Sequence, residues 1–326
     1  MEYWYSRGLY PLIASFQGWI NRWLFISLGE LFLAIGLVVA IVIFMRWFKD
    51  LRYAPEKAIP KGMRSLITLI LLALVAFNGL WGLNYGRLPI STSVNVPVSQ
   101  PTIKELEEVT YWLADQAALE RKKIDWALVE ETATSKLLSG VDGAFYQLPD
   151  RLNFLSFGGT QPKLLGSSIY FSYAGIAGIY NPFTGEGNIN HMAPTHTLPV
   201  TAAHELAHYR GITREDEANF IAWAVCAYSD DPLYAYSGHV LAMIHSSNAL
   251  YSVDKPAWEA FMVQLDPGIK EDLQKSRDFW NTYEGWFEEV NREVNDQYLK
   301  ANKQAEGVKS YGRMVDLLIG WKRLAD

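Results

Sequence analysis

The chain has 326 residues, half of them hydrophobic, and carries 12 Trp, 18 Tyr and 15 Phe. This composition supports a folded core and excludes a disordered or low-complexity protein. The single cysteine excludes an internal disulfide framework and a cysteine-rich zinc module. The net charge of −6 divides into +5 over residues 1–90 and −11 over residues 91–326. Because the folded part carries no basic stripe, a nucleic-acid partner is not expected.

Two uncharged apolar runs within the first ninety residues predict membrane-spanning helices. With their flanks they cover about residues 28–48 and 65–85, which is long enough to cross a bilayer. Ser27 and Glu30 have the spacing of a capping box, which predicts the start of the first helix. The sequence therefore predicts a membrane protein with two spans close to its N-terminus.

The basic residues between the two runs predict the orientation in the membrane. Residues 46–64 hold six Lys or Arg residues, and short basic loops stay in the cytoplasm. We therefore interpret residues 1–90 as a membrane anchor and residues 91–326 as a domain outside the cytoplasm, on the same side as the N-terminus. Residues 8–25 mix Trp and Leu with polar residues, which favours an interfacial helix over a third span.

The predicted domain carries one motif with a chemical meaning, the HExxH sequence at residues 204–208. It lies in a predicted helix that begins near Pro199 and ends at Gly211, and a second helix should follow. His204 and His208 are four residues apart on one helix face, so they can bind one Zn²⁺ together. Glu205 lies beside that face, where it can act as general base towards a zinc-activated water.

A catalytic zinc site needs a third protein ligand, and three acids near the start of the second predicted helix are candidates: Glu215, Asp216 and Glu217. Asp216 has capping-box spacing with Thr213, and the helix dipole explains an acid in the first turn at Glu215. Glu217 heads the apolar stripe of the helix, so its carboxylate needs a cation. We therefore predict Glu217 as the third zinc ligand. The alternative is a salt bridge between Glu217 and Arg210 or Arg214.

The region upstream of the motif predicts the strands of a small sheet. Residues 168–180 are aromatic and β-prone, although glycines interrupt them, and residues 188–190 could form a short strand after a turn. With the predicted helices, this favours an α+β domain that is mostly helical.

The motif helix and the acids that follow resemble the gluzincin arrangement, and Glu-Ala-Asn at residues 217–219 is similar to an element of the metallopeptidases that cleave phage repressors. The whole chain resembles a bacterial family of unknown function with two N-terminal spans and a zincin-like domain. The resembling stretches are Phe77–Arg87, Tyr180–Gly187, Pro199–Trp223 and Tyr298–Leu318.

This resemblance implies a zincin fold, in which an edge strand drawn here from residues 180–190 holds an extended substrate. It also implies a donor to the transition state, for which Tyr298, Tyr311 and Arg313 are weak candidates. Arg210 departs from the pattern, because zincins often have an apolar residue there. We therefore expect that end of the motif helix to be more exposed than usual.

Three functions are compatible with the sequence. The first is a membrane-anchored zinc metallopeptidase that hydrolyses a peptide or protein outside the cytoplasm, with Glu205 as general base. The second is a zinc-dependent hydrolase of a non-peptide amide in the cell wall or in lipid. The third is a non-catalytic membrane interaction protein with structural zinc, which Glu205 argues against because a structural site has no use for it. No oligomeric state is predicted.

Overall fold

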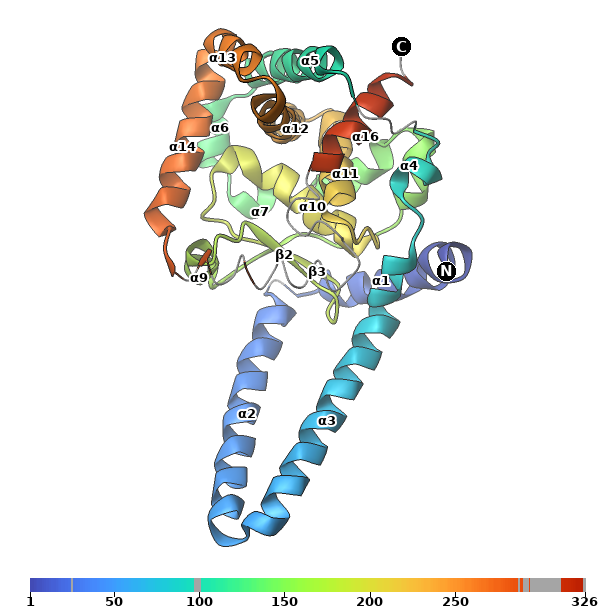
Figure 1. The fold of residues 1–326 in the computed structure, drawn as a ribbon, viewed down its shortest axis with the longest axis vertical. Helices are drawn as coiled ribbons and strands as arrows, with labels where there is room; N and C mark the ends of the chain where they lie inside the picture. The colour runs from blue at the N-terminus through green and yellow to red at the C-terminus, as the bar shows by residue number, and fades with distance from the viewer. Residues whose placement is uncertain (25, 97–100, 287, 290–292, 294–311, 325–326) are drawn as a thin grey trace.

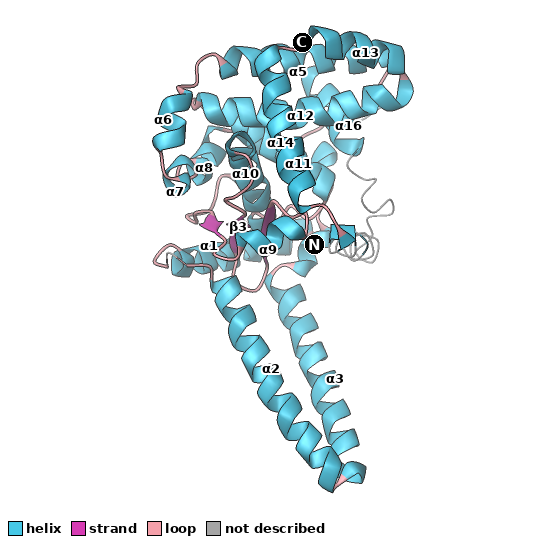
Figure 2. Cartoon of the chain, turned by 90° about the vertical axis from the view of Figure 1, so that its left-hand side faces the viewer, coloured by secondary structure: helices cyan, strands magenta, loops and turns pink. Residues whose placement is uncertain are grey.

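A computed structural model describes residues 1–24, 26–96, 101–286, 288–289, 293 and 312–324. A helical body lies at one end of a long hairpin of two helices (Figure 1). Figure 2 shows the same arrangement after a quarter turn. The hairpin consists of α2 (Leu28–Tyr53) and α3 (Pro55–Leu80).

Both helices of the hairpin are long and apolar enough to cross a membrane. Only 6 % of the apolar window of α2, and none of that of α3, is buried, so neither is a core helix of the body. The predicted cap is half confirmed: the Ser27 side chain accepts the backbone N–H of Glu30. The Glu30 carboxylate instead accepts the backbone N–H groups of Gly166 and Ser167 in the body.

The prediction of a loop over residues 46–64 is wrong. Only Ala54 separates α2 from α3, so the basic residues lie on the last turns of one helix and the first turns of the next. Pro55 occupies the first position of α3, where its missing N–H costs no helical hydrogen bond. The second apolar helix accordingly runs over residues 55–80 rather than 65–85.

The N-terminal segment packs against the body, so the division at residue 90 is wrong for this part. A π-helical segment (η1, Glu2–Leu9) leads into α1 (Tyr10–Asn21). Tyr10 is buried, and its hydroxyl donates to the carbonyl of Tyr209, while the Tyr209 hydroxyl donates to the carbonyl of Ala14. Gly18 is required here, because a Cβ would lie 2.4 Å from the Tyr209 hydroxyl. With twelve residues, α1 is too short for a third span.

The chain leaves α3 through a 3-10 turn (η2, Gly82–Gly86) and a short helix (α4, Ile90–Ser93). The other helices of the described body are α5 (Ile103–Arg121), α6 (Trp126–Glu131), α7 (Thr134–Leu137), α8 (Val141–Ala144), α9 (Ser168–Tyr173), α10 (Leu198–Tyr209), α11 (Glu215–Ala227), α12 (Pro232–Val253), α13 (Lys255–Gln264), α14 (Pro267–Tyr283) and α16 (Arg313–Lys322), with 3-10 turns at Phe145–Gln147, Asp150–Leu155 and Thr195–Thr197.

The core of the body forms where α12 contacts α5, α10 and α11. Three helices begin with a capping Asp whose side chain accepts a backbone N–H, followed within two residues by Pro: α12 after Asp231, α13 after Asp254 and α14 after Asp266. The body is therefore mostly helical, as predicted.

A three-stranded sheet lies on the side of the body that faces α2 and α3 (Figure 1). Its strands are β1 (Lys163–Leu164), β2 (Gly178–Asn181) and β3 (Glu186–Ile189), and β3 is central, parallel to β1 and antiparallel to β2. The small sheet is confirmed, but most of residues 168–180 form α9 and a turn, and only their end is a strand.

The β2–β3 turn follows from its sequence. The Asn181 side-chain oxygen accepts the backbone N–H groups of Phe183 and Thr184, and Gly185 has φ +70°. Asn at the first position and Gly at a left-handed position are the residues that such a turn requires.

Candidate metal centre

The HExxH sequence lies on α10, whose limits agree with the predicted helix. Pro199 occupies its first turn, and the chain reverses at Gly211 with φ +77°. A residue with a Cβ is strained at this φ, so glycine allows the close turn that brings α11 beside α10. The two helices are in extensive contact, and the first residue of α11 therefore lies near the motif.

The two histidines present their Nε2 atoms to the same point, 3.0 Å apart. The His208 Nδ1 donates to the carbonyl of Ile212 at 2.7 Å, and the His204 Nδ1 lies 2.9 Å from the side-chain oxygen of Asn219. A hydrogen bond at Nδ1 fixes the ring and leaves Nε2 as the free ligand atom, which is the arrangement of metal-binding histidines.

Glu215 completes a group of three potential ligands with His204 and His208. Its carboxylate oxygens lie 3.1 Å and 3.6 Å from the two Nε2 atoms, and the three ligand atoms lie within 4.8 Å of one another. Burial raises the pKa of Glu215, but the imidazoles outweigh it and hold that pKa well below its usual range. Two imidazoles and a carboxylate form a donor set that suits Zn²⁺.

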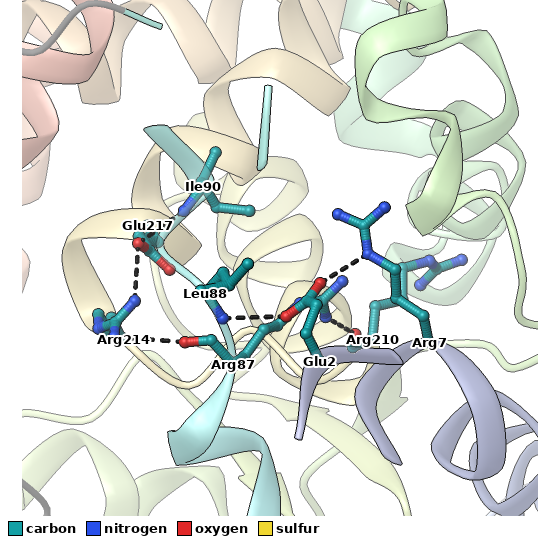
Figure 3. Close-up of polar contacts among 8 residues, drawn as sticks. All are labelled: Glu2, Arg7, Arg87, Leu88, Ile90, Arg210, Arg214 and Glu217. Carbon is teal, nitrogen blue, oxygen red and sulfur yellow. Dashed lines mark hydrogen bonds and ion pairs between the residues drawn. The ribbon is translucent and has the colours of Figure 1, made fainter. Parts of the chain in front are cut away.

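The structure does not bring Glu217, the predicted third ligand, into this group. The Glu217 carboxylate accepts the backbone N–H of Ile90 at 2.9 Å and pairs with Arg214 at 3.1 Å (Figure 3). Glu217 is buried, as expected from its place on the apolar stripe, and burial raises its pKa to about 7. The cation that it meets is Arg214, which was the alternative drawn from the sequence.

Glu215 rather than Glu217 lies beside the two histidines because of the residue at which α11 begins. Its N-cap is Arg214, with no side-chain cap, so the capping role predicted for Thr213 and Asp216 is not found. Glu215 is therefore the first residue of the helix. Because Cα–Cβ bonds tilt towards the N-terminus of a helix, the side chain of this residue can project beyond the helix end, towards α10.

The side chain of Glu205, which belongs to α10, points towards strand β2. Its buried carboxylate accepts a hydrogen bond from the backbone N–H of Tyr180, and burial raises its pKa. The strand can come this close because of two glycines: a Cβ on Gly178 would lie 2.6 Å from a Glu205 carboxylate oxygen, and one on Gly187 would lie 2.9 Å from the Glu205 Cβ. A carboxylate with a raised pKa is a stronger base, as proton abstraction requires.

A cleft of about 730 Å³ opens over these residues. It is lined by the three potential ligands, Glu205, Asn219, strand β2, and Trp81 and Tyr85 from the segment after α3. Side-chain exposures of 17 % for His204 and 21 % for Glu215 leave the site accessible.

Several residues of this cleft were not predicted from the sequence. Asn219 comes from α11, Trp81 and Tyr85 from the exit of α3, and His245 from α12. The first three lie in stretches that carry the family resemblance, but no role in the site was assigned to any of the four. Of the predicted donors, Arg313 at the start of α16 is not among the residues that line the cleft, and Tyr298 and Tyr311 lie outside the described residues.

The expected exposure around Arg210 is also wrong. Arg210 is fully buried, pairs with Asp142 at 2.6 Å, and stacks its guanidinium over the Phe145 ring at 3.5 Å. The carbonyl of Arg210 accepts a hydrogen bond from Arg87, which follows η2 (Figure 3). The end of the motif helix is therefore held by charged groups inside the body.

Replacing Asn219 by Ala should lower the zinc affinity by about 10–100-fold, the usual effect of losing a partner that orients a ligand. The His204 ring would lose the acceptor at its Nδ1. Competition with a chromophoric chelator measures the affinity. The matched control is Asn248→Ala on the exposed face of α12. An Asn219→Ala protein with the affinity of the control would show that the contact does not orient the ligand.

The chain belongs to a protein family of unknown function, DUF3810, whose model matches residues 5–319. It matches no curated protein and no solved structure.

Proposed function

We propose that this DUF3810 protein is a membrane-anchored zinc metallopeptidase. The observation that carries the proposal is the convergence of His204, His208 and Glu215 on one point, with Glu205 beside them and a strand edge along the same cleft. The three potential protein ligands found among the described residues leave one coordination place open, as in catalytic rather than structural zinc sites. This number of ligands argues against a purely structural metal.

Each residue of the site has a separate task. His204, His208 and Glu215 would hold the ion, while Asn219 and the Ile212 carbonyl keep the two rings in place. A bound zinc ion supplies Lewis acidity, which polarises a carbonyl group and acidifies water. Glu205 takes the proton of the attacking water and passes it to the leaving amine.

Strand β2 supports a peptide as the substrate rather than another amide. The Ala177 carbonyl accepts the backbone N–H of Asn190 on the β3 side. Since backbone groups alternate along a strand, those of Gly178 and the carbonyl of Tyr180 point to the outer edge, while the Tyr180 N–H on that edge donates to the Glu205 carboxylate. That edge lines the cleft, so an extended peptide can pair with it by main-chain hydrogen bonds.

Exchange of Glu205 for Gln tests the catalytic part. The full-length protein, purified in mild detergent, should carry about one zinc ion per chain and cleave a peptide library. Glu205→Gln should keep the metal but lower turnover by at least about a hundredfold, because the general base is lost. The control is Glu259→Gln on the exposed face of α13.

Undiminished turnover by Glu205→Gln would remove Glu205 from the mechanism. Zinc binding without cleavage of any peptide, but with hydrolysis of acylated amino sugars or lipid amides, would favour the non-peptide hydrolase instead.

We further propose that α2 and α3 span the cell membrane, with the Ala54 turn in the cytoplasm and the body outside. The basic residues around the turn support this orientation. The native Cys226 is fully buried and should not react, so any labelling by a thiol reagent reports on a single introduced cysteine. In intact cells Lys57→Cys should be protected from an impermeant thiol reagent and Lys255→Cys should be labelled. The reverse pattern would overturn the orientation.

A further inference from the structure

Strand β2 and the exit of α3 together indicate where a substrate comes from. The residues that line the cleft begin directly after α3, whose last residue is Leu80. The next residue, Trp81, lines the cleft, donates its indole N–H to the carbonyl of His208 at 2.8 Å, and packs its ring against Tyr180 at 5.5 Å. One wall of the cleft is therefore the chain as it leaves the candidate span.

Strand β2 runs towards that same end. The turn after Asn181 is held by α1, because the Gln17 amide donates to the carbonyls of Pro182 and Phe183, both at 3.2 Å. The Phe183 ring packs against Phe77 in α3 at 6.5 Å. The Asn181 end of the cleft therefore lies at the apolar hairpin.

The start of α2 is tied to the same strand pair. The Glu186 carboxylate in β3 accepts the first backbone N–H groups of α2, from Leu28 at 3.0 Å and from Gly29 at 2.8 Å. Both candidate spans thus contact the strand pair, which Figure 1 shows directly above them.

The outer face of α1 lies at the same end of the body as the hairpin. Its inner face is buried in the body, while Leu12, Phe16 and Trp19 on the other face are 69 %, 62 % and 54 % exposed, and Trp23 just beyond is 65 % exposed. In both figures α1 lies crosswise at the base of the body, beside the upper end of the hairpin. Tryptophan and other apolar side chains in this position are typical of a membrane interface.

We infer that the substrate is a polypeptide tethered to the same membrane, bound in extended form along β2, with its anchor on the N-terminal side of the cleaved bond. This inference rests on the proposed peptidase function. Since β2 ends at the membrane side and antiparallel pairing is the more stable kind, an added strand starts at the Asn181 end and runs outwards. Its N-terminal residues then lie nearest to the bilayer.

Anchored peptides test this polarity in liposomes that contain the full-length, zinc-loaded protein. One pool of randomised segments is made in three forms: lipidated at the N-terminus, lipidated at the C-terminus, and not lipidated. We expect the N-terminally anchored form to be cleaved at least about tenfold faster than the other two, because only its tether raises the local concentration in the productive direction. Equal rates for all three, or a preference for the C-terminal anchor, would overturn the inference.

Crosslinking gives a readout that does not depend on hydrolysis. In Glu205→Gln protein, a photoreactive residue replaces either the exposed Phe183, which follows the lining residue Pro182, or Ile176, which lines the cleft beyond the other end of β2. N-terminally anchored peptides should crosslink near their anchor to position 183 and farther from it to position 176. The reversed order, or no crosslink at either position, contradicts the inference.

The two proposals fail in different ways. A protein that cleaves neither anchored nor free peptides contradicts the peptidase function. A protein that cleaves free peptides as fast as anchored ones contradicts only the membrane-tethered substrate.

Discussion

Glu215→Ala should weaken zinc binding by more than the 10–100-fold or so that the loss of an outer partner costs, because it removes a ligand itself. The Glu215 oxygens are the only carboxylate oxygens grouped with the two Nε2 atoms among the described residues. Glu215→Gln should show the same loss, since it keeps the size of the side chain but removes its charge. Chelator competition on the purified protein measures both variants.

Glu217→Ala is the informative comparison, because it lies two residues away and should keep nearly the full zinc affinity. It should instead lower the stability by about 1–3 kcal/mol, since the buried N–H of Ile90 loses its acceptor and Arg214 loses its partner. Thermal unfolding of the zinc-free proteins separates the two effects. A Glu217→Ala protein that loses zinc, beside a Glu215→Ala protein that keeps it, would restore the ligand predicted from the sequence.

The difference between Glu215 and Glu217 shows which features of the site can be predicted from residues that are close in the sequence. The HExxH spacing, the stop at Gly211 and the next helix depend on neighbours in sequence. The limits of α10 agree with the prediction within about two residues, and α11 follows as predicted. The burial of Glu217 also follows from the apolar stripe of α11. The hydrogen-bond partner of Glu217 does not follow from this stripe, because the Ile90 amide comes from a segment 127 residues earlier.

The remaining errors have the same cause. Residues 8–25 have the composition of an interfacial helix, but the packing of Tyr10 and Ala14 against Tyr209 depends on a residue almost two hundred positions away. The basic stretch between the apolar runs is predicted from the sequence as a short cytoplasmic loop that joins two spans. In the structure Trp47 donates to the carbonyl of Ala58 across the hairpin, and helix continues on both sides of Ala54.

Arg210 is the residue at which the resemblance to zincins misled most, and it carries the largest expected effect on stability. Its guanidinium is fully buried, and besides Asp142 it donates to the carbonyls of Leu155 and Leu206. Removing one partner of a buried ion pair leaves a charge without compensation, which typically costs about 3–5 kcal/mol. Asp142→Asn should therefore lower the unfolding midpoint of the zinc-free protein strongly.

The matched control is Glu259→Gln, which breaks an exposed ion pair with Lys255 on α13 and should cost less than about 1 kcal/mol. The double variant Asp142→Leu with Arg210→Met removes both charges and should be more stable than Asp142→Asn, because no buried charge is left unpaired. If Asp142→Asn shifts the midpoint no more than Glu259→Gln, the pair does not hold the end of α10. The backbone carbonyl of Arg210 also accepts a hydrogen bond from Arg87, so the end of the helix that carries both histidines contacts the segment after the candidate spans as well as Asp142.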